Sequence, residues 1–249
     1  MQLRIGSSGF SYDFWRGGFY PRELDDGDML AYYAARFDTV EINNTFYRMP
    51  NAAVLRRWAE VVPAHFRFVI KASRRITHVA RLRDVGSDVA YLFRQLEALG
   101  DKLGPVLLQC PPFLRADVEL LRGFLALLPQ GCEPVLEFRH RSWFDASVYD
   151  ALRERGACLC ISDEDRADPP VVATAEVGYL RLRGEDYDDE TLRTWLRRMA
   201  GWPRSYVFFK HEATAPRLIE RARALAAAPA VDPPGGDDDP DRSAPHSTP

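Results

Sequence analysis

Residues 106–139 read VLLQCPPFLRADVELLRGFLALLPQGCEPVLEFR, and this stretch decides the fold class. It opens on the apolar run Val106–Gln109 and closes on a second short apolar run, Val135–Arg139. Between them, apolar residues recur at helical spacing from Val118 to Leu128. Continuous apolar strands joined by an amphipathic helix are typical of parallel strands that are covered on both faces. The stretch therefore predicts one β–α–β unit of an α/β protein.

The same alternation extends along the body of the chain. Eight segments have the composition of strands, namely Leu3–Gly6, Thr39–Asn43, Arg67–Ala72, Val106–Gln109, Val135–Arg139, Ala157–Asp163, Gly178–Arg183 and Ser205–Lys210. Amphipathic helical segments separate most of them, whereas the sixth connection contains Pro169-Pro170 and is expected to be a loop. Eight such units predict a single-domain (β/α)8 TIM barrel. The alternative is an open doubly wound sheet, but no Gly-x-Gly-x-x-Gly turn follows the first strand.

Length and charge set the domain boundaries. The chain has 249 residues, 33 of them basic and 36 acidic, and 46% are hydrophobic, which suits one large domain at residues 1–228. Residues 229–249 hold five aspartates, one arginine and six prolines, so we expect a disordered tail there. Since the tail contributes −4 to the net charge of −3, residues 1–228 carry +1. That balance disfavours a broad nucleic-acid-binding surface.

The N-terminal sequence, the apolar runs and the cysteines indicate in which cellular compartment the protein is expected. Met1–Gly6 lacks the charged-then-apolar profile of a signal peptide, and the longest apolar run, Ala224–Val231, is too short to span a bilayer. We therefore expect a cytoplasmic protein without a membrane partner. Cys158 and Cys160 would share one strand face, and the four cysteines are expected to be reduced core thiols. No sequence pattern indicates an oligomeric state.

Polar residues stand at the expected carboxyl ends of the strands, where the chemistry of such barrels lies. They are Glu41, Asn43, Lys71, Gln109, Glu137, Arg139, Asp163, Arg181, Arg183 and Lys210. Three pairs are spaced two apart, so each pair shares one strand face. Glu137 has two interpretations: a structural ion pair with Arg181 or Lys71, or a catalytic acid or base. The local balance of five cations and three acids predicts an anion-binding mouth.

Aromatic residues flank these strand ends. We expect Phe14 and Phe19 to form a small core, and Tyr12, Tyr47 and Trp143 are candidates for ligand contact. A metal site is not expected. The five histidines of the chain are too few for a histidine-rich multi-zinc centre. Mg²⁺ or Mn²⁺ could bind the carboxylate oxygens of Glu137 and Asp163, but the nearby cationic side chains would compete for those oxygens. Schiff-base chemistry at Lys71 or Lys210 stays open, since a desolvated lysine can be nucleophilic.

Several ordered blocks resemble the YecE-like family, domain of unknown function 72. The blocks are Gly6–Tyr12, Phe19–Pro21, Val40–Tyr47, Phe68–Ala72, Ile76–His78, Leu103–Pro112 and Glu137–Trp143. The resemblance implies an irregular (β/α)8 barrel, similar in shape to endonuclease IV and xylose-isomerase-like barrels, and it implies no known reaction. The family's recurring polar positions correspond here to Glu41, Asn43, Tyr47, Lys71, His78, Gln109, Glu137, Arg139, Trp143 and Asp163.

Two blocks depart from the family pattern. Where the family has Arg-x-His-Gly at the seventh strand, this chain has Arg181-Leu182-Arg183-Gly184. Where the family ends the eighth strand in Phe-Asn-Asn, this chain has Phe208-Phe209-Lys210-His211. Both changes add positive charge at the strand ends.

Three functions remain as hypotheses. The first is a metal- and cofactor-independent hydrolase, lyase or isomerase acting on a small anionic, phosphorylated sugar-like or nucleotide-like substrate. In it Glu41, Glu137 or Asp163 transfers a proton, at least one of the three has a pKa raised by partial burial, and the cations hold the anion. The second is a nucleic-acid-binding or processing barrel, which the near-neutral domain disfavours. The third is a noncatalytic ligand-binding module with the same rim.

Overall fold

The computed structural model describes residues 1–164, 169–210 and 213–228. Its strands are β1 (Gln2–Ser7), β2 (Thr39–Ile42), β3 (Arg67–Lys71), β4 (Leu103–Gln109), β5 (Pro134–Glu137), β6 (Cys158–Leu159), β7 (Ile161–Ser162), β8 (Val177–Leu182) and β9 (Arg204–Phe209). Every strand pair is parallel. The chain is therefore an α/β protein with parallel sheets, as the sequence predicts.

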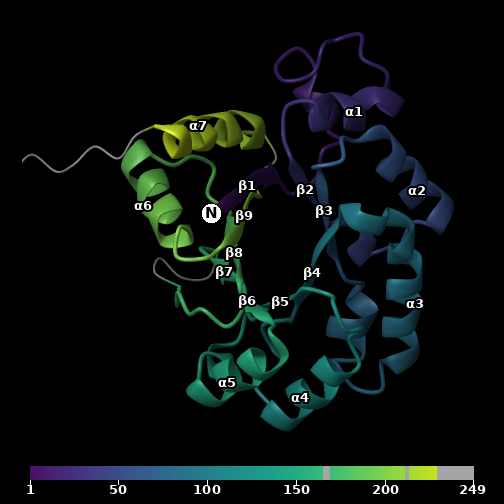
Figure 1. Cartoon of the computed structure of the whole chain (residues 1–249), viewed down its shortest axis with the longest axis vertical. Coiled ribbons are helices and arrows are strands. Elements are labelled where there is room, and N and C mark those ends of the chain that lie inside the picture. The colour runs from purple at the N-terminus through teal and green to yellow at the C-terminus, as the bar shows by residue number, and fades with distance from the viewer. Residues whose placement is uncertain (165–168, 211–212, 229–249) are drawn as a thin grey trace, which may run out of the picture.

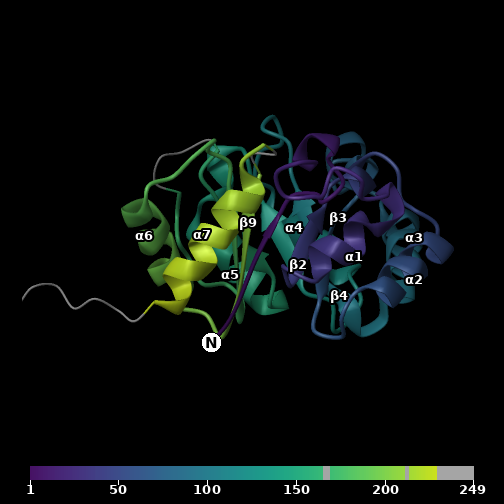
Figure 2. The same cartoon turned by 90° about the horizontal axis from the view of Figure 1, so that it is seen from above.

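The first six helices lie between successive strands, and α7 follows the last strand. They are α1 (Met29–Ala34), α2 (Ala52–Val61), α3 (Gly86–Leu96), α4 (Val118–Ala126), α5 (Ala146–Arg155), α6 (Asp189–Met199) and α7 (Ala215–Ala227). These helices lie outside the strands (Figure 1), and α7 packs on β1 and β9 (Figure 2). In the described part of the sixth connection, residues 163–164 and 169–176, the chain is a loop, as expected.

Polar side chains mark where the helices start and a glycine ends one of them. Asn51 accepts a hydrogen bond from the backbone of Val54 and so caps α2, as a short polar residue at an N-cap does. Asp117, Asp145 and Asp188 cap α4, α5 and α6 in the same way. Gly156 ends α5 with a φ of 67°, a left-handed conformation that glycine adopts without steric cost.

The strands form two sheets that meet at two places. One sheet has the order β1-β9-β8-β7 and the other β2-β3-β4-β5-β6. The expected sixth strand, Ala157–Asp163, is two short strands, β6 and β7, which are broken at Cys160 and belong to different sheets. At the other seam Ser8 pairs with Glu41 in a single parallel bridge. A Cβ on Gly6 would lie 2.2 Å from the carbonyl oxygen of Thr39, so glycine permits this close approach of β1 and β2.

Two apolar clusters form the interior. The larger one fills the space between strands and helices. The smaller one, the inner cluster, joins residues of both sheets with Cys160, which lies between β6 and β7: Val69, Leu107, Val135, Cys158, Cys160, Val177, Tyr179, Tyr206 and Phe208. Cys158 and Cys160 are buried free thiols that share this cluster, although Cys160 belongs to no strand.

The sequence also led to expectations about the C-terminal tail and about membrane-spanning helices. The predicted disordered tail, residues 229–249, and His211 lie outside the described residues. Within the described residues, no helix is both long enough and apolar enough to cross a membrane.

Candidate functional site

A layer of polar side chains lies directly above the inner cluster. In five strands the residue two positions after a member of the inner cluster is polar, and alternation along a strand places both on the same face. The five pairs are Val69 and Lys71, Leu107 and Gln109, Val135 and Glu137, Tyr179 and Arg181, and Phe208 and Lys210. Lys71, Gln109, Glu137 and Arg181 therefore face the interior between the two sheets, and Lys210 follows directly after the end of β9.

Arg181 is the centre of this layer. Its side chain has no exposed surface, and its guanidinium donates to Glu41 at 2.7 Å and to Glu137 at 2.5 Å. These two carboxylates come from β2 and β5, and each is at most 1% exposed. The result is a buried carboxylate–guanidinium–carboxylate bridge across the interior.

Glu41 is surrounded by donors besides Arg181. It accepts hydrogen bonds from Ser8 Oγ at 2.6 Å, Tyr179 Oη at 2.5 Å and Asn43 Nδ2 at 3.1 Å. Burial by itself raises the pKa of a carboxyl group, but Arg181 and these donors outweigh burial and lower the pKa of Glu41. Glu41 is therefore an ionised anchor, and Asn43 orients it.

Glu137 has a similar environment with more cations. Its partners are Arg139 Nε at 2.8 Å, Gln109 Nε2 at 2.9 Å and Arg183 Nη2 at 3.5 Å, in addition to Arg181. Burial opposes ionisation, but Arg181, Arg139 and Arg183 lower the pKa of Glu137 to about 2. The expectation of a raised pKa is therefore wrong for both glutamates. Of the two interpretations of Glu137, the ion pair is present, and its partner is Arg181.

Lys71 differs from Arg139, Arg181 and Arg183, which all pair with carboxylates. Its Nζ donates to the neutral Gln109 Oε1 at 2.9 Å and lies 4.2 Å from the ring centroid of Phe46. Burial, followed by repulsion from Arg181, lowers the pKa of Lys71 from 10.5 to about 8. His78 packs edge-on against the same Phe46 ring, with centroids 4.9 Å apart. Burial and the nearby Lys71 also hold the pKa of His78 below its usual range.

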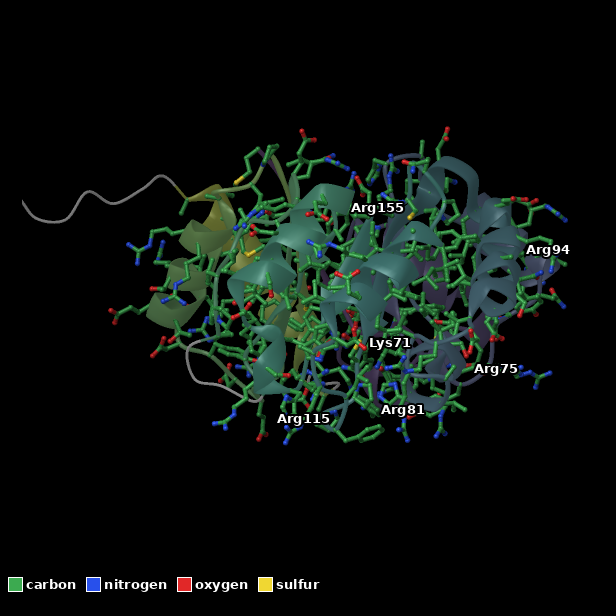
Figure 3. All side chains as sticks on the ribbon, turned by 90° about the horizontal axis from the view of Figure 1, so that it is seen from below. Lys71, Arg75, Arg81, Arg94, Arg115 and Arg155 are labelled. Atoms are coloured by element: carbon green, nitrogen blue, oxygen red, sulfur yellow. The ribbon has the colours of Figure 1, made fainter. Side chains whose placement is uncertain are left out.

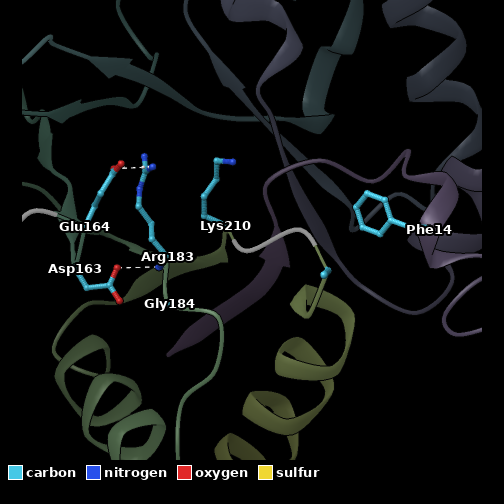
Figure 4. Close-up of a pocket in the computed structure, with 7 residues that line it drawn as sticks. Phe14, Asp163, Glu164, Arg183, Gly184 and Lys210 are labelled. Atoms are coloured by element: carbon cyan, nitrogen blue, oxygen red, sulfur yellow. Dashed lines mark hydrogen bonds and ion pairs between the residues drawn. The ribbon is translucent and has the colours of Figure 1, made fainter.

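A pocket of about 770 Å³ opens beside this layer, at the carboxyl ends of β7, β8 and β9. Its lining includes Phe14, Asp163, Glu164, Arg183 and Lys210 (Figure 4). Glu164 accepts from Arg183 Nη1 at 2.6 Å and also pairs with Arg139. A carboxylate thus already lies between two guanidinium groups at the pocket wall.

Asp163 has a structural role at the same wall. One of its oxygens accepts the backbone N–H of Arg183 at 2.8 Å, and the other accepts the hydroxyl of Tyr187. These bonds tie the end of β7 to the loop after β8. Asp163 therefore fixes the backbone that carries Arg183, and its carboxylate oxygens are both engaged.

The aromatic predictions need correction. Trp143 has no exposed surface, stacks on Phe138 at 4.3 Å and donates its indole N–H to the carbonyl of Leu114, so it is a core residue and not a ligand contact. Phe14 was expected in the core but is 59% exposed and lines the pocket. Tyr47 is 75% exposed, beside Phe46.

Tyr12 lies between the pocket and a second cavity. It donates to the carbonyl of Ser8 at 2.7 Å and packs 5.2 Å from Phe14. It also lines the second cavity, of about 530 Å³, together with Asn43. The prediction that Tyr12 contacts a ligand stays a prediction.

Sequence reasoning missed Glu164. It follows a strand end within an irregular charged segment, Asp163–Asp168, in which no periodicity singles out one residue. With Glu164 included, the rim has five cations and four acids, so its charge is +1 and not the expected +2. Among the described residues, no group of three or more histidine, cysteine, aspartate or glutamate side chains is arranged to hold a metal ion.

Comparisons with known proteins place this chain in a family. A family model described as "Protein of unknown function DUF72" matches residues 4–241. The chain is 28% identical over 229 residues to the UPF0759 protein YecE of Escherichia coli (strain K12), covering 80% of this chain and 81% of that protein. It is 26% identical over 197 residues to the UPF0759 protein YunF of Bacillus subtilis (strain 168), covering 74% and 67%. The crystal structure of a DUF72 family protein from Thermotoga maritima matches with a TM-score of 0.77 at 26% identity, covering 90% of this chain and 97% of that one.

Proposed function

The chain belongs to the DUF72 family of proteins of unknown function, and we propose that it is an enzyme of the lyase or isomerase type acting on a small anionic, phosphorylated sugar-like molecule. The substrate binds at the carboxyl ends of the strands. Its anion lies against Arg183 and Lys210, and Lys71 moves a proton. The family membership confirms the resemblance read from the sequence blocks, and the function is inferred from the site alone.

The proposal includes closure of the two sheets into one irregular (β/α)8 barrel. When β6 and β7 are counted as one strand broken at Cys160, the nine strands become eight. The Ser8–Glu41 bridge and the hydrogen bond from Gly9 N to Glu41 O, 2.8 Å long, support the second seam. The inner cluster, shared by both sheets, supports a filled barrel interior. A barrel would place the polar layer at the mouth where such folds carry their sites.

One observation carries the anion-binding part of the proposal: a carboxylate already bridges Arg139 and Arg183. Glu164 makes this bridge from a loop, with its side chain 32% exposed. Guanidinium groups bind carboxylates and phosphates with the same geometry. A ligand anion that replaced Glu164 would find both guanidinium groups in place, with Lys210 on the adjoining wall (Figure 4).

The proton-transfer part follows from the pKa directions. Glu41 and Glu137 stay ionised at neutral pH, and they hold Arg181 in position. Lys71 is the layer's base, since a pKa of about 8 lies close to the working range of a general base. Proton abstraction next to a carbonyl is the step shared by many lyases and isomerases. This assignment replaces the carboxylate acid/base chemistry expected from the sequence.

Calorimetric titration with inorganic phosphate at low ionic strength tests anion binding. We expect binding in the millimolar range or tighter, and Arg183→Ala should weaken it by about tenfold or more, because a charge-assisted hydrogen bond contributes about 1.5–3 kcal/mol. Arg122→Ala is the matched control, since Arg122 also pairs with two glutamates but lies on α4. Absence of phosphate binding, or equal effects of both variants, would contradict the anion site.

A nucleic-acid-binding function is the second candidate, because exposed arginines surround the same face. Arg75, Arg81 and Arg115 lie toward the same edge of the molecule as Lys71 (Figure 3). Arg81 also stacks on the 60%-exposed Phe113 ring. Several phosphate contacts would make the affinity for single-stranded DNA fall steeply with salt, whereas a small-molecule enzyme would show no such binding at physiological salt.

A further inference from the structure

Lysine is rare in this chain, and its positions are informative. Of the 33 basic side chains, 30 are arginines, and the lysines are Lys71, Lys102 and Lys210. Arginine serves almost everywhere as the cation. The chemical property that lysine has and arginine lacks is an amine that can lose its proton and attack an electrophile. A lysine inside a layer built with arginines therefore calls for a reason other than charge.

Lys102 has a structural reason of this kind. Its Nζ donates to the carbonyl oxygen of Val62 at 2.7 Å and to that of Ala59, which closes the end of α2. A compact ammonium group fits between two carbonyls. Lys210 lines the anion pocket beside Arg183. Lys71 has neither environment.

The surroundings of Lys71 favour a reactive amine. Its Nζ bonds to an amide oxygen and faces an aromatic ring, and among the residues that the structure describes no carboxylate lies within 4.0 Å of it. The strand-end carboxylates of Glu41 and Glu137 form ion pairs with Arg181. The residue is 8% exposed, so its side chain is largely removed from water. Desolvation without a carboxylate partner is how enzymes activate a lysine nucleophile.

We propose that Lys71 forms an imine with the aldehyde or ketone carbon of a small anionic substrate. This inference rests on the proposed function, which supplies the anion and the site. In the imine reaction the Lys71 amine is the nucleophile, and His78 takes over the proton transfer that the proposed function assigns to Lys71. The Lys71 nitrogen bonds to the carbonyl carbon, and the carbonyl oxygen leaves as water with the two amine protons. The imine nitrogen then takes up one proton and becomes an electron sink for cleavage or enolisation at the adjacent carbon.

Two neighbours fit this chemistry. His78 shares the Phe46 ring with Lys71, and the lowered pKa of His78 leaves its imidazole neutral and able to accept a proton. Thr77 Oγ1 lies 2.9 Å from His78 Nδ1 and fixes the ring. The pKa of Lys71 also supports the reaction: a value of about 8 leaves about one tenth of the side chain as free amine at pH 7, about 300 times more than an ordinary lysine at 10.5.

Reductive trapping tests the proposal on the wild-type chain. The protein is incubated at pH 7 with glyoxylate, pyruvate, dihydroxyacetone phosphate or glyceraldehyde 3-phosphate, each with cyanoborohydride, and the three lysines are mapped by mass spectrometry. We expect at least one compound to label Lys71 about tenfold or more above Lys102, with the mass of the compound less one oxygen atom. Excess inorganic phosphate should reduce this label.

Two variants complete the experiment. Lys71→Arg should lose the label at that position while phosphate calorimetry stays close to wild type, which also shows that the variant is folded. Lys102→Arg should leave the Lys71 label unchanged. Equal labelling of all lysines, or no label on Lys71 with any of the four compounds while phosphate still binds, overturns the imine and leaves the proposed function standing. If phosphate does not bind but Lys71 is still labelled, the proposed anion site is contradicted and the proposal that Lys71 is a nucleophile is supported.

Discussion

Replacing Arg181 by methionine tests the buried bridge on which the polar layer depends. The substitution keeps most of the side-chain volume and removes the guanidinium between Glu41 and Glu137. Both carboxylates are at most 1% exposed, and each loses a partner at 2.7 Å or 2.5 Å. Glu41 keeps Ser8, Asn43 and Tyr179, and Glu137 keeps Gln109, Arg139 and the more distant Arg183. The variant therefore buries two negative charges with only partial compensation.

The cost of the substitution follows from its burial. Breaking a buried ion pair by removing one partner costs about 3–5 kcal/mol. The Glu137 pKa, lowered from 4.5 to about 2, corresponds to about 3 kcal/mol at pH 7 for Arg181, Arg139, Arg183 and Gln109 together, and Arg181 is the largest of these contributors. For a domain of this size, we expect the melting temperature to fall by about 6–20 °C.

The pH dependence has a definite sign. Because the folded pKa of Glu137 is lowered, its contribution to stability is full above pH 4.5 and is lost as the pH falls toward about 2. Thermal unfolding by circular dichroism at pH 7 and pH 3 should therefore show a large gap between wild type and Arg181→Met that narrows on acidification. Arg122→Met is the control, because Arg122 also pairs with two glutamates, Glu119 and Glu154, at the surface, where such pairs contribute little. Equal effects of the two substitutions, or a gap between wild type and Arg181→Met that is as large at pH 3 as at pH 7, would refute the reasoning.

Two further predictions concern the pocket and the tail. Glu164→Gln should tighten phosphate binding by about twofold to fivefold in calorimetry, because a partly exposed carboxylate that competes for Arg139 and Arg183 is worth about 0.5–1 kcal/mol; unchanged or weaker binding would show that Glu164 does not compete with the ligand. Ending the chain after Ala228 should leave the melting temperature nearly unchanged, since we place the domain at residues 1–228, and a large loss of stability would move that boundary.

The strands and the inward residues were predictable because they rest on local periodicity. Alternation alone placed Glu137 with Arg139 and Arg181 with Arg183 on common faces, and the structure brings all four into contact. The break at Cys160 was not predictable, because Ala157–Asp163 is continuously apolar up to Ser162 and its assignment to two sheets depends on β5 and β8.

The pKa directions and the aromatic roles depend on tertiary contacts. Arg181 reaches Glu41 across 140 residues of sequence and Glu137 across 44, so no local pattern could show that one arginine would keep both glutamates ionised. Trp143 and Phe14 exchange their expected roles for a similar reason. Phe138 stacks on the Trp143 ring and helps to bury it, whereas the Phe14 ring lines the pocket.

The most direct test of a reactive amine in the polar layer is the titration of the lysines by NMR. With carbon-13-labelled lysine, the chain gives three ε-methylene signals, and Lys71→Arg identifies the one from Lys71. We predict that this signal titrates with a midpoint of about 8, and that saturating phosphate raises the midpoint because a nearby anion favours the ammonium form. A midpoint for Lys71 near 10.5, the ordinary lysine value, with no response to phosphate would contradict both the site and its chemistry.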